Sequence, residues 1–299
     1  MTIKLSSSNH KKRDSFKVYI NGRYVSWNRA SISIFDRGLK YGDGIFETMK
    51  SYNGRVFTMN RHLVRLNRSI RAIGIIFKGL GDIKTIIDKL LRLNKLDREE
   101  AYIRLTITRG IDPGGLLPSR NLKPSIIITA KPVDSKKISR LQKKGIKACF
   151  FDSESTSMHS LKTLNFLPYV LAKIAAAKEG AAEGLMTYNG FVAEGASSNL
   201  FTVVDRCLKT PPLDGNILPG ITREIIIELG RKEGLTCIET PVTIEKLLSS
   251  EEVFISNSIS EVVPVTRIGD KIIGSGKRGV VTYRLQELYR GLVSDNASR

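Results

Sequence analysis

The chain has 299 residues, of which 41% are hydrophobic and 26% charged, and its formal net charge is +19. This composition is that of an ordinary globular protein, and the sequence predicts neither a membrane span nor a secretory signal. Three well-separated cysteines, an odd number, argue against a disulfide framework and for the reducing cytoplasm. The basic residues are spread along the chain rather than gathered in one block, so a basic nucleic-acid-binding protein is only a remote alternative.

The first part of the chain mixes short strands with two helices. In chain order, the patterns predict a disordered basic extension over residues 1–17, a hairpin around Asn21-Gly22, a strand pair from 48 to 57 around Asn53-Gly54, a helix after Asn60 that ends at Gly74, a helix over 83–93, and strands over 102–108 and 126–130. In the strand over 102–108, Tyr102, Arg104, Thr106 and Thr108 share one face, and isoleucine and leucine share the other. This strand should turn its polar face to a cleft and its apolar face to a core.

The polar residues 132–138 predict an interdomain linker between a small domain over 18–131 and a large domain over 139–299. In the large domain, the patterns predict a strand over 146–151, a helix near 165–179, a hairpin around Asn189-Gly190, strands over 200–204 and 253–256, and helices over 223–232 and near 281–292. Because strands and helices do not alternate strictly, the order predicts an α+β fold in two domains.

Lys162 stands out because of its surroundings. It follows a polar stretch and precedes an apolar pattern, which predicts that a helix opens at Thr163 and buries Phe166, Leu167, Val170, Leu171 and Ile174. A lysine at the mouth of such a helix is partly desolvated, and this favours the neutral, nucleophilic amine.

Three further groups have chemistry that complements the Lys162 amine. Glu194 ends a hairpin strand, where a buried carboxylate would pair with a protonated ring nitrogen. Gly220-Ile221-Thr222 opens a helix, whose N–H groups, dipole and hydroxyl form an anion site. Arg65, beside the apolar stripe of its helix, would reach a phosphate bidentately. Amine, carboxylate and anion site match pyridoxal 5'-phosphate, an aldehyde with a basic ring nitrogen and a phosphate.

In their order along the chain, these segments resemble the class IV aminotransferases, the fold-type-IV pyridoxal phosphate enzymes, from about residue 18 to residue 292. The resemblance rests on the segments 36–47, 62–66, 162–165, 194–199, 218–223 and 256–265. It implies a small N-terminal and a larger C-terminal α/β domain with the cofactor between them. It also implies a homodimer whose partner subunit helps to close the pocket.

The resemblance assigns a role to each matching residue. Lys162 is implied to bind the cofactor covalently and to shuttle the proton, and Glu194 to pair with the ring nitrogen. The remaining cofactor contacts are implied for Arg65, Ser197, Leu218, Ile221, Thr222 and Ser258. The substrate contacts are implied for Tyr41, Phe46, Tyr102, Arg104 and Ile259. No metal site is predicted.

The substrate differs among the family members that this chain resembles. Tyr41, Phe46 and Tyr102-Ile103-Arg104 are typical of branched-chain aminotransferases, which implies ping-pong transamination between two small molecules, a branched-chain L-amino acid and 2-oxoglutarate. The Lys-x-x-Asn spacing after Lys162, and Phe166 where those enzymes have a tyrosine, resemble instead D-amino acid aminotransferase or aminodeoxychorismate lyase. The Arg-x-His pair of typical D-amino acid enzymes is missing from residues 112–118. These alternatives stay open.

Overall fold

The computed structural model describes residues 16–153 and 157–298, and the chain separates into two compact units. The first unit holds the chain as far as Val133 together with residues 162–164, and the second holds residues 134–161 and everything from Asn165 onward. Residues 1–15 of the predicted extension lie outside the described residues. Lys17, also assigned to that extension, instead begins the first strand.

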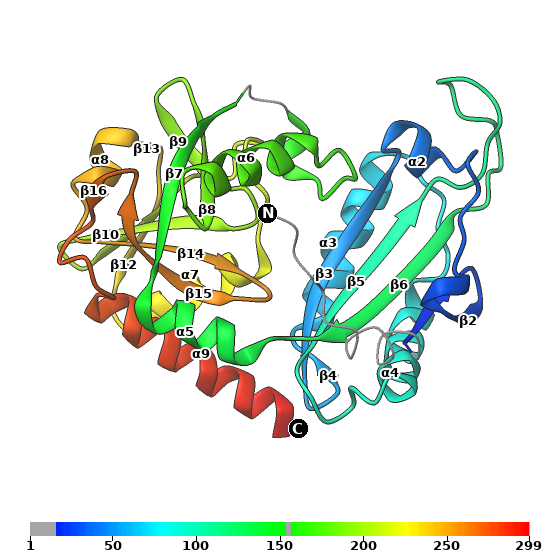
Figure 1. The fold of residues 1–299 in the computed structure, drawn as a ribbon, viewed down its shortest axis with the longest axis horizontal. Coiled ribbons are helices and arrows are strands. Elements are labelled where there is room, and N and C mark those ends of the chain that lie inside the picture. The colour runs from blue at the N-terminus through cyan, green and yellow to red at the C-terminus, as the bar shows by residue number, and fades with distance from the viewer. Residues whose placement is uncertain (1–15, 154–156, 299) are drawn as a thin grey trace. The chain divides into compact units, whose positions relative to one another are not determined.

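The first unit is an antiparallel sheet with two helices packed against it (Figure 1). In spatial order, its described strands are β2 (Arg23–Ser26), β1 (Lys17–Ile20), β6 (Ser125–Pro132), β5 (Ala101–Thr108), β3 (Gly44–Tyr52) and β4 (Arg55–Val56). Its helices are η1 (Trp27–Arg29), α2 (Arg37–Tyr41), α3 (Met59–Ala72), η2 (Leu80–Asp82) and α4 (Ile83–Leu93). Helix α3 packs on β3, and α4 packs on β1 and β6.

Alternation along β5 sets the two faces of this sheet. Ile103 and Leu105 are fully buried and join Leu66 of α3 and Ile87 of α4 in one core. Tyr102, Arg104 and Thr106 are half-buried, as the predicted alternation requires. Thr108, predicted on the same face, is instead buried, and its hydroxyl donates to the Asp36 Oδ2 at 2.9 Å.

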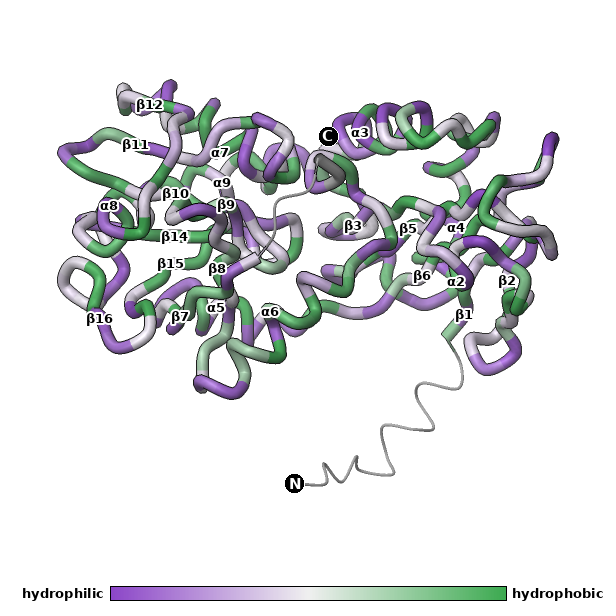
Figure 2. Tube along the Cα trace, turned by 90° about the horizontal axis from the view of Figure 1, so that it is seen from above, coloured by the Kyte–Doolittle hydropathy of each residue, from purple (hydrophilic) through white to green (hydrophobic). Residues whose placement is uncertain are grey.

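The second unit is built on a mixed sheet. In spatial order, its described strands are β12 (Thr236–Glu239), β11 (Cys207–Thr210), β10 (Asn199–Val204), β14 (Glu252–Asn257), β15 (Glu261–Ile268), β7 (Ile146–Asp152), β8 (Glu183–Tyr188), β9 (Phe191–Gly195) and β13 (Val242–Thr243), with β16 (Lys271–Ile272) beside β15. Its helices are α5 (Ser135–Lys144), η3 (Ser157–Ser160), α6 (Leu167–Lys178), α7 (Ile221–Lys232), α8 (Ile244–Leu248) and α9 (Val280–Ser298). Figure 2 shows the neighbouring strands β10 and β14 largely in the green of hydrophobic residues, and most residues of both strands are buried.

The turns explain why the hairpins were predictable. Asn21-Gly22, Asn53-Gly54 and Asn189-Gly190 all have positive φ at both residues, the conformation that two-residue hairpin loops require. The predicted hairpins and the mixed α and β architecture are confirmed. No helix among the described residues is long and apolar enough to cross a membrane.

The stretch over 132–138 contains more regular structure than a linker. Pro132 ends β6, and α5 begins at Ser135, where the Asp134 Oδ1 accepts a hydrogen bond from the Lys137 N–H at 2.9 Å. Helix α5 buries only Gln142, so its sequence lacks the apolar stripe by which a helix is recognised.

The helix after Lys162 also differs from its prediction. It begins at Leu167, with Pro168 in its first turn, a position that needs no backbone N–H. Its buried residues are Ala172 and Ala176, whereas four residues assigned to the buried face are exposed: Leu167, Val170, Leu171 and Ile174. The helix lies too close to β8 for large side chains, because a Cβ on Gly184 would come within 2.6 Å of the Ala172 carbonyl oxygen.

Candidate active site

Lys162 lies in an extended segment held against β3 rather than at a helix mouth. The Phe46 N–H donates to the Lys162 carbonyl at 2.9 Å, and the Leu164 N–H donates to the Gly44 carbonyl at 3.0 Å. Thr163 forms an isolated bridge with Ile45 between these two bonds. The backbone of the first unit therefore positions this lysine, whose side chain is half-buried.

Two cationic side chains lie against the Phe46 ring. The Lys162 Nζ lies 4.6 Å from the ring centroid, and the Arg104 guanidinium carbon lies 3.7 Å from it. Both contacts are in the range of cation–π attraction. The ring is only 2% exposed, so it serves as a platform that joins Lys162 to Arg104 rather than as an open apolar wall.

The other predicted substrate residues of the first unit also lie against cations. Tyr41 ends α2 and is 37% exposed, with the Arg37 guanidinium carbon and the Lys40 Nζ each 4.9 Å from its ring centroid. The Lys131 Nζ lies 4.7 Å from the ring centroid of Tyr102.

A buried ion cluster joins β3 to α3. The Arg65 Nε and Nη2 donate to the two carboxylate oxygens of Glu47 at 2.7 and 2.6 Å, and the His62 Nδ1 lies 2.8 Å from Oε2. Burial alone would raise the pKa of Glu47, but the Arg65 charge and the bonds from Arg65 and His62 outweigh it and hold that pKa at about 2. Burial lowers the pKa of His62 below its usual value, so the net charge of the cluster is close to zero at neutral pH. Arg65, predicted to bind phosphate, thus has part of its guanidinium committed to Glu47.

Glu194, on β9, is the carboxylate to which several side chains and backbone groups of the second unit donate hydrogen bonds. It is 4% exposed. Its Oε2 accepts from the Leu218 N–H at 3.1 Å and from the Asn199 Nδ2 at 3.3 Å, and its Oε1 accepts from the Tyr169 hydroxyl at 3.3 Å. Donors to both oxygens fix the orientation of the carboxylate.

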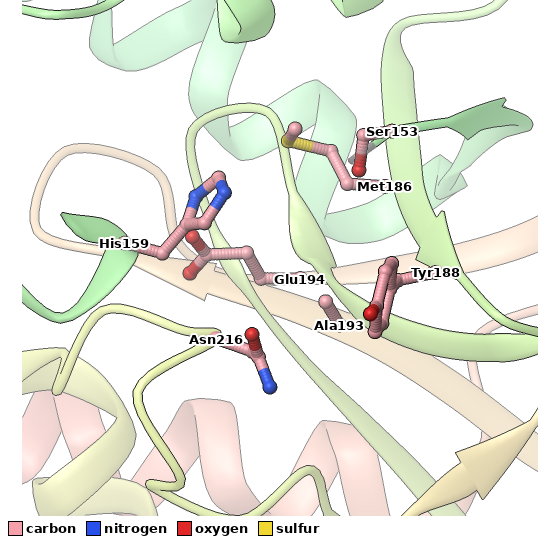
Figure 3. A pocket seen from close by; sticks show the side chains of 7 residues that line it. All are labelled: Ser153, His159, Met186, Tyr188, Ala193, Glu194 and Asn216. Carbon is pink, nitrogen blue, oxygen red and sulfur yellow. The ribbon is translucent and has the colours of Figure 1, made fainter. Parts of the chain in front are cut away.

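A small pocket opens beside Glu194. Figure 3 shows the His159 imidazole close to the Glu194 carboxylate, and the pocket is also lined by Ser153, Met186, Tyr188, Ala193 and Asn216.

The start of α7 approaches Glu194 through Asn199. The helix begins at Ile221 after Gly220, as the Gly-Ile-Thr motif predicted, and Thr222 is 3% exposed. A Cβ on Gly220 would lie 1.9 Å from the Asn199 Oδ1, so only glycine allows this approach. The Asn199 amide also donates to the Leu218 carbonyl at 2.9 Å. Asn199 was missed as a site residue, although its place five residues after Glu194 could have suggested it.

Ser258 and Ile259 lie in the turn between β14 and β15. The Asn257 Oδ1 accepts from the N–H groups of Ile259 and Ser260 at 3.0 and 2.7 Å. The turn ends at Glu261, which has a φ of 62° and whose carboxylate accepts from the Gln142 Nε2 at 3.0 Å. Side-chain bonds therefore hold this turn in one conformation.

Ser197 bonds to a second buried carboxylate. Its hydroxyl donates to the Glu183 Oε2 at 3.3 Å, and the Ser198 hydroxyl donates to the same oxygen at 3.1 Å. The Lys173 Nζ pairs with Glu183 at 2.8 Å. Glu183 was also missed, because one acid in an apolar strand gives no local signal.

These groups fit pyridoxal phosphate. The first unit supplies a lysine amine and an arginine held by Glu47, and the second supplies a buried carboxylate and a helix start with no room for a Cβ at Gly220. An amine suits the aldehyde, a charged carboxylate suits the ring nitrogen, and a helix start with a hydroxyl suits the phosphate. The two units together supply the groups that a pyridoxal-phosphate-binding protein needs.

The family follows from comparison with known proteins. Residues 44–268 match the family described as amino-transferase class IV. The chain belongs to this family and is a pyridoxal-phosphate-dependent aminotransferase.

Relatives with different activities are about equally similar to this chain. A Methanocaldococcus jannaschii protein provisionally named a branched-chain-amino-acid aminotransferase is 37% identical over 282 residues, which cover 92% of this chain and 96% of the relative. The D-alanine aminotransferase of Staphylococcus haemolyticus is 34% identical over 94% of this chain and 99% of its own length. The aminodeoxychorismate lyase of Bacillus subtilis is 34% identical over 91% and 93%. Overall identity therefore does not select a substrate.

A solved structure has the same fold. The branched-chain amino acid aminotransferase of Escherichia coli superposes with a TM-score of 0.88 at 29% identity, over 94% of this chain and 96% of that one.

Proposed function

We propose that the enzyme transfers the amino group of a branched-chain L-amino acid to 2-oxoglutarate by a ping-pong mechanism. The observation that carries this proposal is the Phe46 ring, over which the Lys162 amine and the Arg104 guanidinium both lie. A guanidinium packed against the same ring as the reactive amine suits a substrate carboxylate, and Tyr102 shares its strand face. In this proposal Tyr41 and Ile259 contact the substrate side chain, whereas the buried Phe46 ring supports Lys162 and Arg104.

The proposed roles follow from the chemistry of each group. Bound pyridoxal phosphate supplies the electron sink that makes the α-proton of an amino acid acidic. Lys162 would hold the cofactor covalently until the substrate amine displaces it, and the freed Nζ would then accept the α-proton and return it to a different carbon. The Glu194 carboxylate would hold a proton at the ring nitrogen, and Leu218 would contact the ring. Arg65, Ile221, Thr222 and Ser258 would bind the phosphate, with Ser197 beside them.

We also infer that two copies of the chain associate in the cytoplasm. Large apolar side chains are exposed on two segments of the first unit, residues 27–41 and 111–117: Trp27, Ile34, Phe35, Leu39, Ile111, Leu116 and Leu117. Exposed apolar groups gathered in this way are typical of interfaces. Light scattering should give twice the mass of the chain, and a monomer would contradict the inference.

The substrate is tested by single half-reactions. The holoenzyme is mixed separately with L-leucine, D-alanine, D-glutamate, an (R)-amine and aminodeoxychorismate, and the absorbance of the bound cofactor is followed. Rapid change with L-leucine alone supports the proposal. Change with a D-amino acid alone would make the enzyme a D-amino acid aminotransferase, and release of pyruvate from aminodeoxychorismate would make it a lyase.

Arg104→Ala should separate the two substrates. We expect KM to rise about tenfold for 2-oxoglutarate, the loss of one hydrogen-bonded charge pair, and about threefold for leucine. The difference arises because 2-oxoglutarate has a second carboxylate to place. Equal changes in the two steady-state KM values would remove Arg104 from the substrate site.

Glu194→Gln should slow the reaction far more than it weakens cofactor binding. The neutral amide cannot hold a proton at the ring nitrogen, so kcat should fall roughly a hundredfold, a size typical for the loss of one electrostatic contact to the reacting system. Cofactor affinity, measured by dialysis and reconstitution, should change less than threefold, because the phosphate contacts remain. Equal losses of occupancy and turnover would show that Glu194 has only a structural role.

A further inference from the structure

Tyr169 of α6 links Glu194 to His159. Its hydroxyl lies 3.3 Å from the Glu194 Oε1 and 2.5 Å from the His159 Nδ1. The tyrosine ring stacks on Phe166 with centroids 4.6 Å apart, and the His159 ring meets its edge at 5.6 Å. Ring contacts on two sides therefore hold the hydroxyl in place between a carboxylate and an imidazole.

The single proton of this hydroxyl determines the direction of the hydrogen bonds. An ionised carboxylate only accepts, so the Tyr169 hydroxyl must donate to Glu194 if the two are to attract each other. The hydroxyl oxygen can then only accept from His159, which requires a proton on the His159 Nδ1. Burial raises the pKa of Tyr169 above its usual value, and the Glu194 charge raises it further, so the tyrosine keeps its proton.

We propose that Tyr169 is a positioning residue, which orients Glu194 through a chain from the His159 Nδ1–H to the Tyr169 hydroxyl and from that hydroxyl to the Glu194 Oε1. The inference rests on the proposed role of Glu194 at the ring nitrogen. Asn199 and Leu218 donate to Oε2, and Tyr169 donates to Oε1. The Tyr169 bond therefore fixes the rotation of the carboxylate together with the two bonds to Oε2.

Tyr169→Phe tests the proposal on the intact holoenzyme. It removes the hydroxyl and keeps the ring that stacks on Phe166. We expect kcat to fall about tenfold, the effect of one hydrogen bond to a charged group, with KM for the amino donor within twofold. The absorption maximum of the bound cofactor should also shift, because its ring nitrogen senses the carboxylate.

Tyr283→Phe is the matched control. Tyr283 lies on α9 of the same unit and is 45% exposed, with the Arg278 guanidinium carbon 4.4 Å from its ring centroid. The same chemical change there should leave kcat and the cofactor spectrum as in the wild type. A Tyr169→Phe enzyme indistinguishable from the Tyr283→Phe enzyme, or one with a lower melting temperature and an unchanged spectrum, would overturn the inference.

A double-mutant cycle separates this inference from the proposed function. If Tyr169 acts through Glu194, Tyr169→Phe should change kcat less than twofold in the Glu194→Gln background. A full tenfold loss in that background would overturn the inference alone. Full activity of Glu194→Gln by itself would instead overturn the proposed role of Glu194.

The tautomer of the His159 imidazole can be measured independently of turnover. The chain has three histidines, so the imidazole nitrogens of His159 can be assigned by comparing ¹⁵N spectra of the holoenzyme and of His159→Ala. A protonated Nδ1 in the wild type is expected. A bare Nδ1 would overturn the proposed direction of the chain.

Discussion

Lys162→Ala should abolish the covalent attachment of the cofactor and lower transamination by about four orders of magnitude, the upper end of what general acid–base catalysis contributes. Among residues 16–153 and 157–298, no other lysine lies in a segment that bridges to β3 as residues 162–164 do. The bonds from Phe46 and to Gly44 involve only main-chain atoms, so the fold should survive the substitution. The measurement is borohydride reduction followed by mass spectrometry of the peptide that contains residue 162, together with kcat for leucine.

The matched control is Lys89→Ala. The Lys89 Nζ lies 4.9 Å from the Tyr24 ring centroid, a contact of the same type in the same unit. Its loss should leave the borohydride-reducible link intact and turnover within twofold. If the link survives in Lys162→Ala, the assignment of the reactive lysine is wrong.

Local patterns predicted those elements whose signals are local. The helix over 83–93 was predicted with both ends correct, because its apolar residues recur at helical spacing and are buried as Ile83, Ile87, Leu90 and Leu91. Each Asn-Gly pair specifies its own hairpin through the backbone conformation that it allows. The Gly-Ile-Thr start of α7 was also predictable, because glycine and threonine mark a helix N-terminus.

The errors arose where tertiary contacts decide the structure. Residues 162–164 look like the first turn of a helix, yet they pair with β3, more than a hundred residues earlier in the chain. Helix α6 packs through alanines because glycine lies beneath it, so its larger residues face outward. An apolar stripe shows that a helix has a distinct face, but not that this face is the buried one.

The partners of the candidate site were harder to predict than its central residues. Glu47 sits among apolar residues of β3 and has no local signature. Its structural role follows from its contacts with His62 and Arg65, which lie three residues apart on one face of α3. Two polar residues at that spacing beside an apolar stripe could have indicated a buried partner. Nothing in the sequence pairs Tyr169 with Glu194.

Glu47→Gln should destabilise the protein by about 3–5 kcal/mol, the usual effect of removing one partner from a buried ion pair. The side chain of Glu47 is 1% exposed and accepts three hydrogen bonds, two from Arg65 and one from His62. An amide presents N–H groups to some of these donors and leaves the buried Arg65 charge uncompensated. Urea unfolding at pH 7 gives the difference in the free energy of unfolding. Asp88→Asn, which removes the exposed Lys84–Asp88 pair on α4, is the control and should cost no more than about 0.5 kcal/mol.

The pH dependence of this difference tests the electrostatic explanation. The folded pKa of Glu47 is about 2, below the ordinary value of 4.5, so the unfolded chain binds the proton more tightly than the folded one. The stabilising effect of Glu47 is therefore fully present above pH 4.5 and is lost as the pH falls toward 2. Glutamine does not titrate, so the gap between wild type and Glu47→Gln should narrow across this window. If the difference in the free energy of unfolding between wild type and Glu47→Gln stayed constant from pH 7 to pH 3, Glu47 would stabilise the unit by shape alone. That result would remove the main support for the idea that Glu47 orients Arg65 to bind a phosphate.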